Sequence, residues 1–337
     1  MSAMSLYIRF GIDTRVKNLT KTLSIFGFII LSSLVLYISG DIYYSSLSAI
    51  IFYYVYLSKL RYREKTISYN FLLNAQKLTF LMIILLVAIF DVLSSKYALY
   101  SLGASYAICS LGCLILNRKI EGCSPRKKEE RVEISVMLKY SANACFLSFF
   151  IWGISVSDQF FIANMFGEKV LAPYAVAFKI SSLLTILSGV LMTYYTPIYF
   201  REMKAGHLSE GDKVRKLSIF SLVLFTFLII VFDKEVYGVM GAAKYYSSSY
   251  LMKIMIISEF CRIVASLFLI YNSYTLNLKY NFCLYFFVAL FVVILNQSLI
   301  PIYGEIGAIS IKIVSSMLIL IFSIKVYCRE RKMILEY

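Results

Sequence analysis

Long apolar runs separated by short polar segments dominate the sequence, and this pattern restricts the possible folds more than any other feature. Hydrophobic residues make up 60% of the 337 residues and charged residues 16%, whereas soluble domains are nearer half apolar and a quarter charged. A bilayer-crossing helix needs about 20 mostly apolar residues, and by that rule the chain holds about ten. They are predicted at 22–39, 42–58, 74–94, 97–116, 140–165, 170–198, 217–233, 249–275, 280–300 and 305–326. We therefore expect an all-α, polytopic bundle of transmembrane helices.

The net charge of +15 reflects lysine and arginine gathered in alternate loops. The loops of the opposite side hold only Lys96, Lys169, Lys234 and Lys244. The positive-inside rule then puts both termini in the cytoplasm and supports an even number of spans. The basic excess is a topology signal, so we expect contact with the lipid bilayer and none with nucleic acid.

A basic cytoplasmic loop at 118–138 divides the chain into two lobes. We predict an N-terminal lobe at 1–117 with four transmembrane helices and a C-terminal lobe at 139–327 with six, followed by a cytoplasmic tail at 328–337. The outer loops are short. The longest, at 233–248, leaves room for little beyond a turn, so no outer domain is expected.

Residues for covalent chemistry are scarce. The single histidine, His207, lies in a polar loop, and the seven cysteines fall in apolar runs or basic loops. These residues offer neither a zinc-type cluster nor a Ser-His-Asp arrangement. We therefore expect no enzyme activity, no catalytic residue, no cofactor and no metal.

Five charged residues lie well away from the ends of the apolar runs of the C-terminal lobe: Asp158, Lys179, Glu259, Arg262 and Lys312. A charge in hydrocarbon is costly, so such residues usually face a protein interior or a water-filled cavity. We predict that Lys179, Lys312 and Arg262 line a cavity. Guanidinium and ammonium groups bind phosphate oxygens well, so this cavity suits an anionic passenger. Asp158 and Glu259 are candidate coupling or structural carboxylates.

Simpler arrangements compete with these roles. Asp158 and Lys179 lie on two apolar runs joined by a short turn, so they could pair with each other across it. Glu259 and Arg262 are i, i+3 neighbours on one helical face and could neutralise each other. Lys253, near the start of its run, could extend its amine to the outer interface.

A family resemblance rests on the order of several short motifs. Residues 157–162 (SDQFFI) are followed by Gly167, by 174–180 (YAVAFKI) and by Pro197, while 304–308 (GEIGA) opens the last run. This order resembles Wzx-type O-antigen or polysaccharide flippases of the multidrug/oligosaccharidyl-lipid/polysaccharide (MOP) superfamily. The similarity covers most of residues 130–327.

The resemblance implies two six-helix lobes around a central cavity that opens alternately to each side of the inner membrane. It implies an undecaprenyl-pyrophosphate-linked oligosaccharide as passenger, and contacts with the polysaccharide polymerase and chain-length machinery. Lys179 matches a basic cavity position of the family, and Arg262 and Lys312 are weaker matches. Residues 1–18 resemble the end of the family's second helix, so the chain is expected to lack the first two helices and part of the N-terminal lobe.

Three other functions remain open. A cation-coupled multidrug exporter of the same superfamily is expected to have an acidic or neutral cavity, whereas these apolar runs lean basic. An O-antigen polymerase is expected to carry a large outer loop, and no loop here is long enough. A shortened, inactive transporter is the third, because the number of predicted helices is low for the family.

Overall fold

The computed structural model describes residues 48–62, 66–89, 95–120, 134–205, 209–270 and 279–335, together with the isolated positions 25, 29, 30, 32, 33 and 272. Within these ranges every regular element is a helix, which confirms the all-α prediction. The chain divides into two compact units, Met1–Ala142 and Asn143–Tyr337. Most of the predicted run at 22–39, most of the loop at 118–138 and the segment 1–18 lie outside the described residues.

Unit 1 contains three described helices that pack on one another: α3 (Ala49–Tyr62), α4 (Thr66–Ile89) and α5 (Ser95–Ile120). Polar side chains join them inside an otherwise apolar contact. The Tyr53 hydroxyl donates to the Leu72 carbonyl at 2.9 Å, and Gln76 Nε2 donates to Ser105 Oγ at 3.0 Å. Such bonds satisfy polar groups that have no water available in a bilayer.

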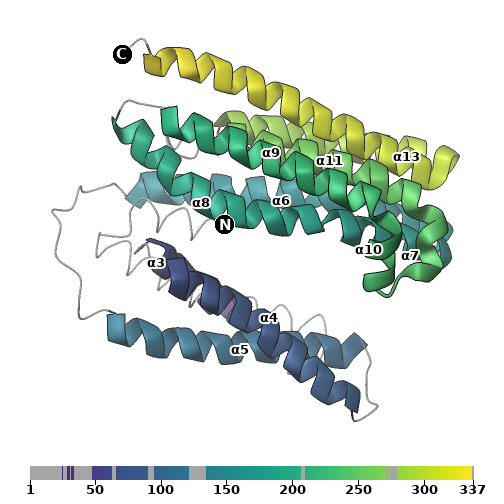
Figure 1. The fold of residues 1–337 in the computed structure, drawn as a ribbon, viewed down its shortest axis with the longest axis horizontal. Coiled ribbons are helices and arrows are strands. Elements are labelled where there is room, and N and C mark those ends of the chain that lie inside the picture. Colours follow the sequence, from purple (N-terminus) through teal and green to yellow (C-terminus); the bar gives the residue numbers. More distant parts are fainter. Residues whose placement is uncertain are drawn as a thin grey trace. The chain divides into compact units, whose positions relative to one another are not determined.

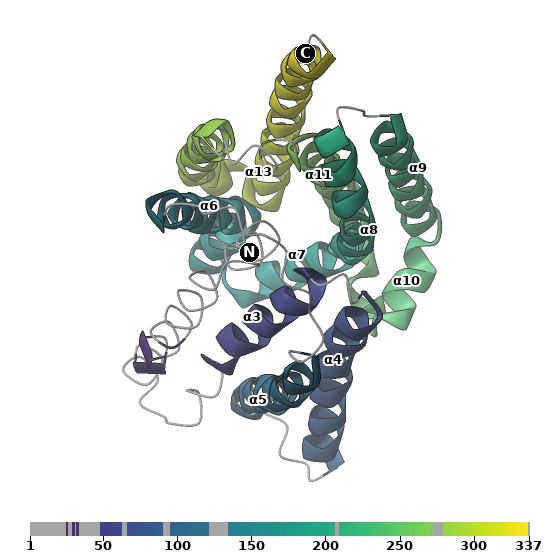
Figure 2. The same ribbon diagram turned by 90° about the vertical axis from the view of Figure 1, so that its left-hand side faces the viewer.

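Unit 2 holds the remaining helices, most of which run side by side (Figure 1). They are α6 (Ile134–Phe166, which begins just before the unit boundary), α7 (Glu168–Ser181), α8 (Leu183–Ala205), α9 (Ser209–Val231), α10 (Asp233–Val239), the 3-10 helix η3 (Ala243–Ser248), α11 (Ser249–Phe268) and α13 (Lys279–Leu335). Helix α11 contacts α7, α8, α9 and α13, and Figure 2 shows it beside α8. The segment 233–248, predicted to be an outer loop with little more than a turn, contains two short helices, α10 and η3.

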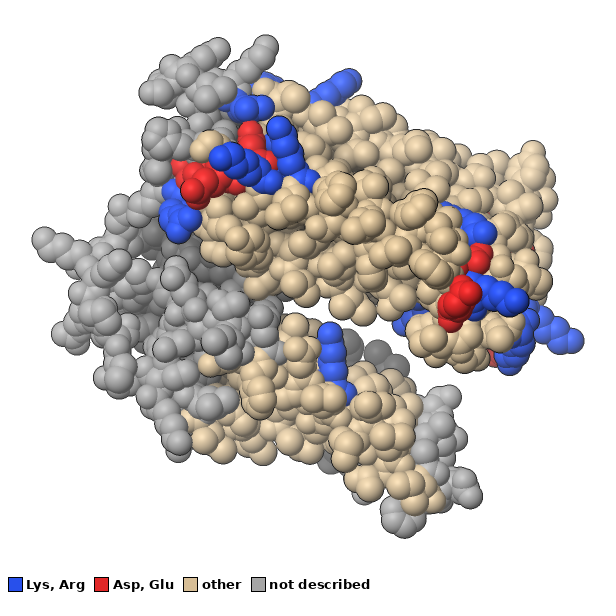
Figure 3. Space-filling view, viewed as in Figure 1, with Lys and Arg blue, Asp and Glu red and all other residues tan. Residues whose placement is uncertain are grey.

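The surface of unit 2 has the charge distribution of a membrane-spanning bundle. On the face seen in Figure 3, charged side chains gather at the two ends of the helices and a broad uncharged band separates them. Helix α9 presents a stripe of exposed apolar side chains at helical spacing, Leu217, Phe220, Leu224, Phe227 and Val231. An apolar surface of this extent is covered by lipid in a membrane protein.

Four segments of the described chain are long and apolar enough to cross a membrane by length and composition: Ala142–Phe166, Glu168–Met203, Ser209–Val231 and Lys279–Arg329. The sequence predicted more membrane-spanning runs, about ten, from the length of its apolar stretches. Part of the difference is that α13 combines the two runs predicted at 280–300 and 305–326. Helix α11 is not counted as a membrane-spanning segment, because its 20 residues include three charged ones, Lys253, Glu259 and Arg262, and a spanning segment of this length is mostly apolar.

The join inside α13 is a sharp backbone break at Gly304, with φ 58° and ψ −137°. Residues with a Cβ rarely adopt this region, so glycine is required there. Gly307 is needed for a different reason, because an added Cβ would lie 2.8 Å from the Leu299 carbonyl oxygen. The two glycines let the chain reverse into the last helical half, which carries Lys312.

The core of unit 2 forms where α7, α9, α11 and the second half of α13 meet. It includes Tyr174, Ile180, Met252, Met255 and Ile309, all at most 3% exposed. A second cluster joins α6 to both halves of α13 through Ile154, Val288 and Ile319. Of the five charged residues singled out in the sequence, Asp158, Glu259 and Lys312 are buried in this unit.

Candidate functional site

Asp158 and Lys312 form a buried ion pair inside unit 2. Lys312 Nζ lies 2.5 Å from Asp158 Oδ2, and the two side chains are only 6% and 4% exposed. Asp158 Oδ2 also accepts a short hydrogen bond from the Tyr174 hydroxyl, and Oδ1 accepts one from the backbone N–H of Gln159 at 2.9 Å. Both carboxylate oxygens are thus engaged, which is what a buried charge requires.

A second ion pair lies on α11, where Arg262 Nη2 is 2.5 Å from Glu259 Oε2. This is the i, i+3 pair that the sequence predicts. Glu259 is buried, and the Arg262 side chain is 21% exposed. Arg262 Nη1 also donates to Ser155 Oγ at 2.8 Å, which ties α11 to α6.

Ser155 connects the two ion pairs. Its hydroxyl oxygen accepts from Arg262, and its backbone carbonyl accepts from Lys312 Nζ at 3.2 Å. Four of the five predicted charged residues therefore converge on one network that joins α6, α7, α11 and α13. Two positive and two negative charges leave this network neutral.

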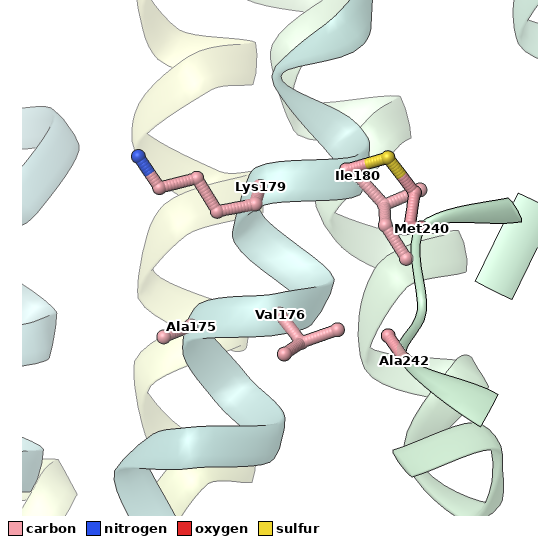
Figure 4. Close-up of a pocket in the computed structure, with 6 residues that line it drawn as sticks. All are labelled: Ala175, Val176, Lys179, Ile180, Met240 and Ala242. Carbon is pink, nitrogen blue, oxygen red and sulfur yellow. The ribbon is translucent and has the colours of Figure 1, made fainter. Parts of the chain in front are cut away.

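Lys179 does not join the network. Its side chain is exposed on unit 2, and within the described residues no ion pair to it is recorded. Its stem borders a shallow, apolar pocket of about 280 Å³. The other lining residues are Ala175, Val176, Ile180, Met240 and Ala242. Figure 4 shows the Lys179 amine pointing away from Met240 and Ala242. The suggested pair between Asp158 and Lys179 is thus wrong.

The helical period explains why. Tyr174 and Lys179 are five residues apart, which separates their side chains by about 140° around an α-helix. Because Tyr174 faces Asp158, Lys179 faces away from it. Lys179 also lies in the last turn of α7, beside a break before α8. The hydroxyls of Ser181 and Ser182 donate to the carbonyls of Phe178 and Lys179 at this break.

Lys253 is held at the outer end of unit 2 by Asp233. Its Nζ lies 2.7 Å from Asp233 Oδ2, while its side chain remains 43% exposed. Desolvation opposes ionisation of Asp233, but hydrogen bonds from Lys253 and Tyr246 outweigh this and lower the pKa of the carboxyl below its ordinary value. Lys253 thus meets a carboxylate at one end of the unit, and that this end faces outward stays a prediction.

Two members of the network were not predicted from the sequence, Tyr174 and Ser155. Tyr174 fell within the motif at 174–180, but nothing marked its hydroxyl as a partner of Asp158. Ser155 is one serine among many, and its two contacts are 107 and 157 residues away in the chain. A tyrosine nearly two turns into the helix that follows the one carrying a buried aspartate is the signal that could have identified Tyr174.

The network is charge-neutral, and the described residues at the site show no nucleophile activated by a base. Lys179 is an exposed cation about 140° around α7 from this network. It lies beside a shallow apolar pocket.

No protein-family model matches the chain, and no curated protein matches it either. Solved structures do. An outward-facing multidrug resistance MATE family transporter of the MOP superfamily has a TM-score of 0.69 and 12% identity, over 98% of this chain and 82% of that one. A MOP superfamily transporter from Pyrococcus furiosus, in which a reverse polarity of the binding pocket suggests a different function, has a TM-score of 0.63 and 14% identity over 100% and 83% of the two chains. The chain is thus a multi-pass membrane protein with the fold of MOP superfamily transporters.

Proposed function

We propose that this protein is a flippase that moves an undecaprenyl-pyrophosphate-linked oligosaccharide, an O-antigen or capsule repeat unit, across the inner membrane by alternating access. The observation that carries the proposal is the state of Lys179. Among Asp158, Lys179, Glu259, Arg262 and Lys312, it is the one for which the described residues supply no ion-pair partner.

The charges favour an anionic passenger. Lys312 and Arg262 are each neutralised by a carboxylate within 2.5 Å. The positive excess in the membrane part of the unit therefore resides on Lys179. A pyrophosphate group offers several anionic oxygens, and an ammonium forms charge-assisted hydrogen bonds with them.

The depth of Lys179 argues against simple contact with lipid. It lies 11 positions after Glu168, the first residue of α7, so it sits about 16 Å below the start of the helix at a rise of about 1.5 Å per residue. A lysine stem is too short to bring its amine to the interface from that depth at little cost. An exposed amine at this depth is therefore expected to face a water-filled cavity.

The other predicted passenger ligands follow in order of their accessibility. Arg262 is partly exposed and could offer a free N–H to an anion, whereas Lys312 is enclosed. We assign Lys179 the main role and Arg262 a supporting one, while the enclosed Lys312 stays bonded to Asp158 and does not contact the passenger. In this proposal the protein performs no covalent chemistry and works beside the polymerase and chain-length machinery of polysaccharide synthesis.

A cation-coupled multidrug exporter is the second candidate, because one of the structural neighbours is a multidrug resistance transporter. The charge of Lys179 argues against it, since a free ammonium repels a cationic drug. Drug resistance conferred by the native chain and raised by Lys179→Ala would favour this candidate.

Complementation of a flippase-deleted strain tests the proposal, with surface polysaccharide as the readout. We expect the native chain to restore it, Lys179→Ala to reduce it about tenfold or more and Lys179→Arg to retain most of it. Lys169→Ala is the matched control, an exposed lysine at the outer end of the same helix. Equal rescue by native and Lys179→Ala protein at equal expression would overturn the assignment of Lys179.

The complementation is repeated in several flippase-deleted strains whose repeat units contain different sugars. If the native chain is expressed in all of them and restores surface polysaccharide in none, the proposed function itself is overturned. Direct transfer of a fluorescent polyprenyl-pyrophosphate sugar in liposomes gives an independent measure, because it does not depend on the downstream polymerase. Transport there by the native protein and not by Lys179→Ala would support both the function and the site.

A further inference from the structure

The surroundings of the Lys312 ammonium have the composition of a bound-cation site. Its Nζ lies 2.5 Å from Asp158 Oδ2 and 3.2 Å from the Ser155 carbonyl oxygen. It also lies 4.5 Å from the centre of the Phe178 ring and 5.8 Å from that of Tyr174. A carboxylate, a backbone carbonyl and aromatic faces are groups that attract a small cation.

The site is built by its neighbours independently of Lys312. The Tyr174 hydroxyl and the backbone N–H of Gln159 each donate to Asp158, so the carboxylate is held from two sides. Ser155 and Asp158 are one turn apart on α6, which brings the carbonyl and the carboxylate to the same place. Lys312 enters from α13, where its own backbone carbonyl accepts from Ser258 at 3.0 Å.

We infer that Lys312 is a tethered cation that permanently fills a monovalent-cation site made by Asp158 and the Ser155 carbonyl. On this assignment Asp158 is a structural carboxylate. Its negative charge is already matched, so the native protein takes up no exchangeable Na⁺ at Asp158, whatever its passenger. Removing the amine while keeping the carboxylate opens the site to a free cation.

Two physical points support this assignment. A second cation at Asp158 would lie within a few ångströms of the Lys312 ammonium, and like charges at that separation repel strongly in a buried site. An unpaired buried carboxylate is equally unfavourable, so a variant without the amine gains most from any small cation that can enter. A cation that binds the folded state alone raises the unfolding midpoint in a saturable way.

The test uses the full chain purified in detergent, with thermal unfolding followed in Na⁺ and in choline at equal ionic strength and one fixed pH. The proteins are native, Lys312→Ala and the double variant Asp158→Asn with Lys312→Met. We expect the native and double-variant midpoints to be the same in both salts. We expect the Lys312→Ala midpoint to be lower in choline and to rise by several degrees, with saturation, as Na⁺ is added.

Lys253→Ala is the matched control, because it removes the partner of Asp233 at a pair whose lysine side chain is 43% exposed. Removal of this partly exposed amine admits water to the Asp233 carboxylate, so we expect no saturable Na⁺ effect. A native midpoint that rises with Na⁺ over choline, while that of the double variant does not, would overturn the inference, because it would reveal an exchangeable cation at Asp158 in the presence of Lys312.

The same Lys312→Ala midpoint in Na⁺ and choline would also overturn it. So would failure of Lys312→Ala to fold in both salts while the double variant folds, because a free cation should then have replaced the amine. Native transport at equal rates in Na⁺ and choline media is the corresponding functional result, and it can be read only if the proposed transport is observed.

Discussion

Lys312 and Lys179 carry the same charge in the apolar part of one unit, but the fold treats them in opposite ways. Lys312 is enclosed between α6, α7 and α13 and bonded to Asp158. Lys179 is exposed beside a break between two helices. Hydropathy identifies a charge inside a membrane span. Whether that charge stabilises the protein or is left free for a ligand depends on which side of its helix it occupies.

The largest expected effect is on the enclosed pair. Asp158→Ala leaves Lys312 buried without a counter-charge, and breaking a buried pair in this way costs about 3–5 kcal/mol of folding stability. Chemical or thermal unfolding in detergent measures it. Lys179→Met should change the same quantity by less than about 0.5 kcal/mol, as for an exposed side chain with no partner. Equal losses in the two variants would erase the distinction between the two lysines.

The pair on α11 should give an intermediate effect. Glu259→Gln removes one charge but leaves Arg262, which is 21% exposed and bonded to Ser155, with access to solvent. The loss of charge-assisted hydrogen bonds is expected to cost about 1–3 kcal/mol. The same unfolding measurement checks the value, with Ser258→Ala on the same helix as a control for a neutral buried bond. A loss of folding stability as large as that of Asp158→Ala would mean that the exposure of an ion pair does not determine how much its loss destabilises the protein.

The smallest effect is expected at the outer pair, Asp233 and Lys253. Because the pKa of Asp233 is lowered on folding, its ionisation stabilises the fold above the ordinary value of 3.8, and this contribution is lost as the pH falls below it. Asp233→Asn should therefore lower the unfolding midpoint slightly at neutral pH and not in strong acid. A difference between native and variant protein that grows as the pH falls would contradict the direction of the shift.

Much of unit 2 could be predicted from the sequence. The predicted runs at 140–165 and 170–198 lie within α6 and within α7 with α8, because apolar length and the turn at Gly167 are local features. The i, i+3 pair of Glu259 and Arg262 is local as well. The break between α7 and α8 was not predicted, since Ser181 and Ser182 are compatible with a continuous helix.

The contacts that define the site could not be predicted. Asp158 and Lys312 are 154 residues apart, and their pairing depends on how α6 and α13 are rotated when they pack. The nearer lysine, Lys179, looked equally suitable because one sequence does not show which side of α7 faces α6. The choice was made by packing, since Tyr174, Ala177, Ile180 and Ser181 are the residues of α7 that are fully buried.

Ser155 has a consequence for cooperativity. Its side chain serves one ion pair and its main chain the other, and both contacts come from a single residue of α6. A rotation of α6 about its axis would carry both oxygens away from their partners together. The contacts of Lys312 and Arg262 with α6 are thus expected to be lost in one step, while Glu259 and Arg262, which both lie on α11, remain paired. Through this one residue, a rotation of α6 acts on both ion pairs at once.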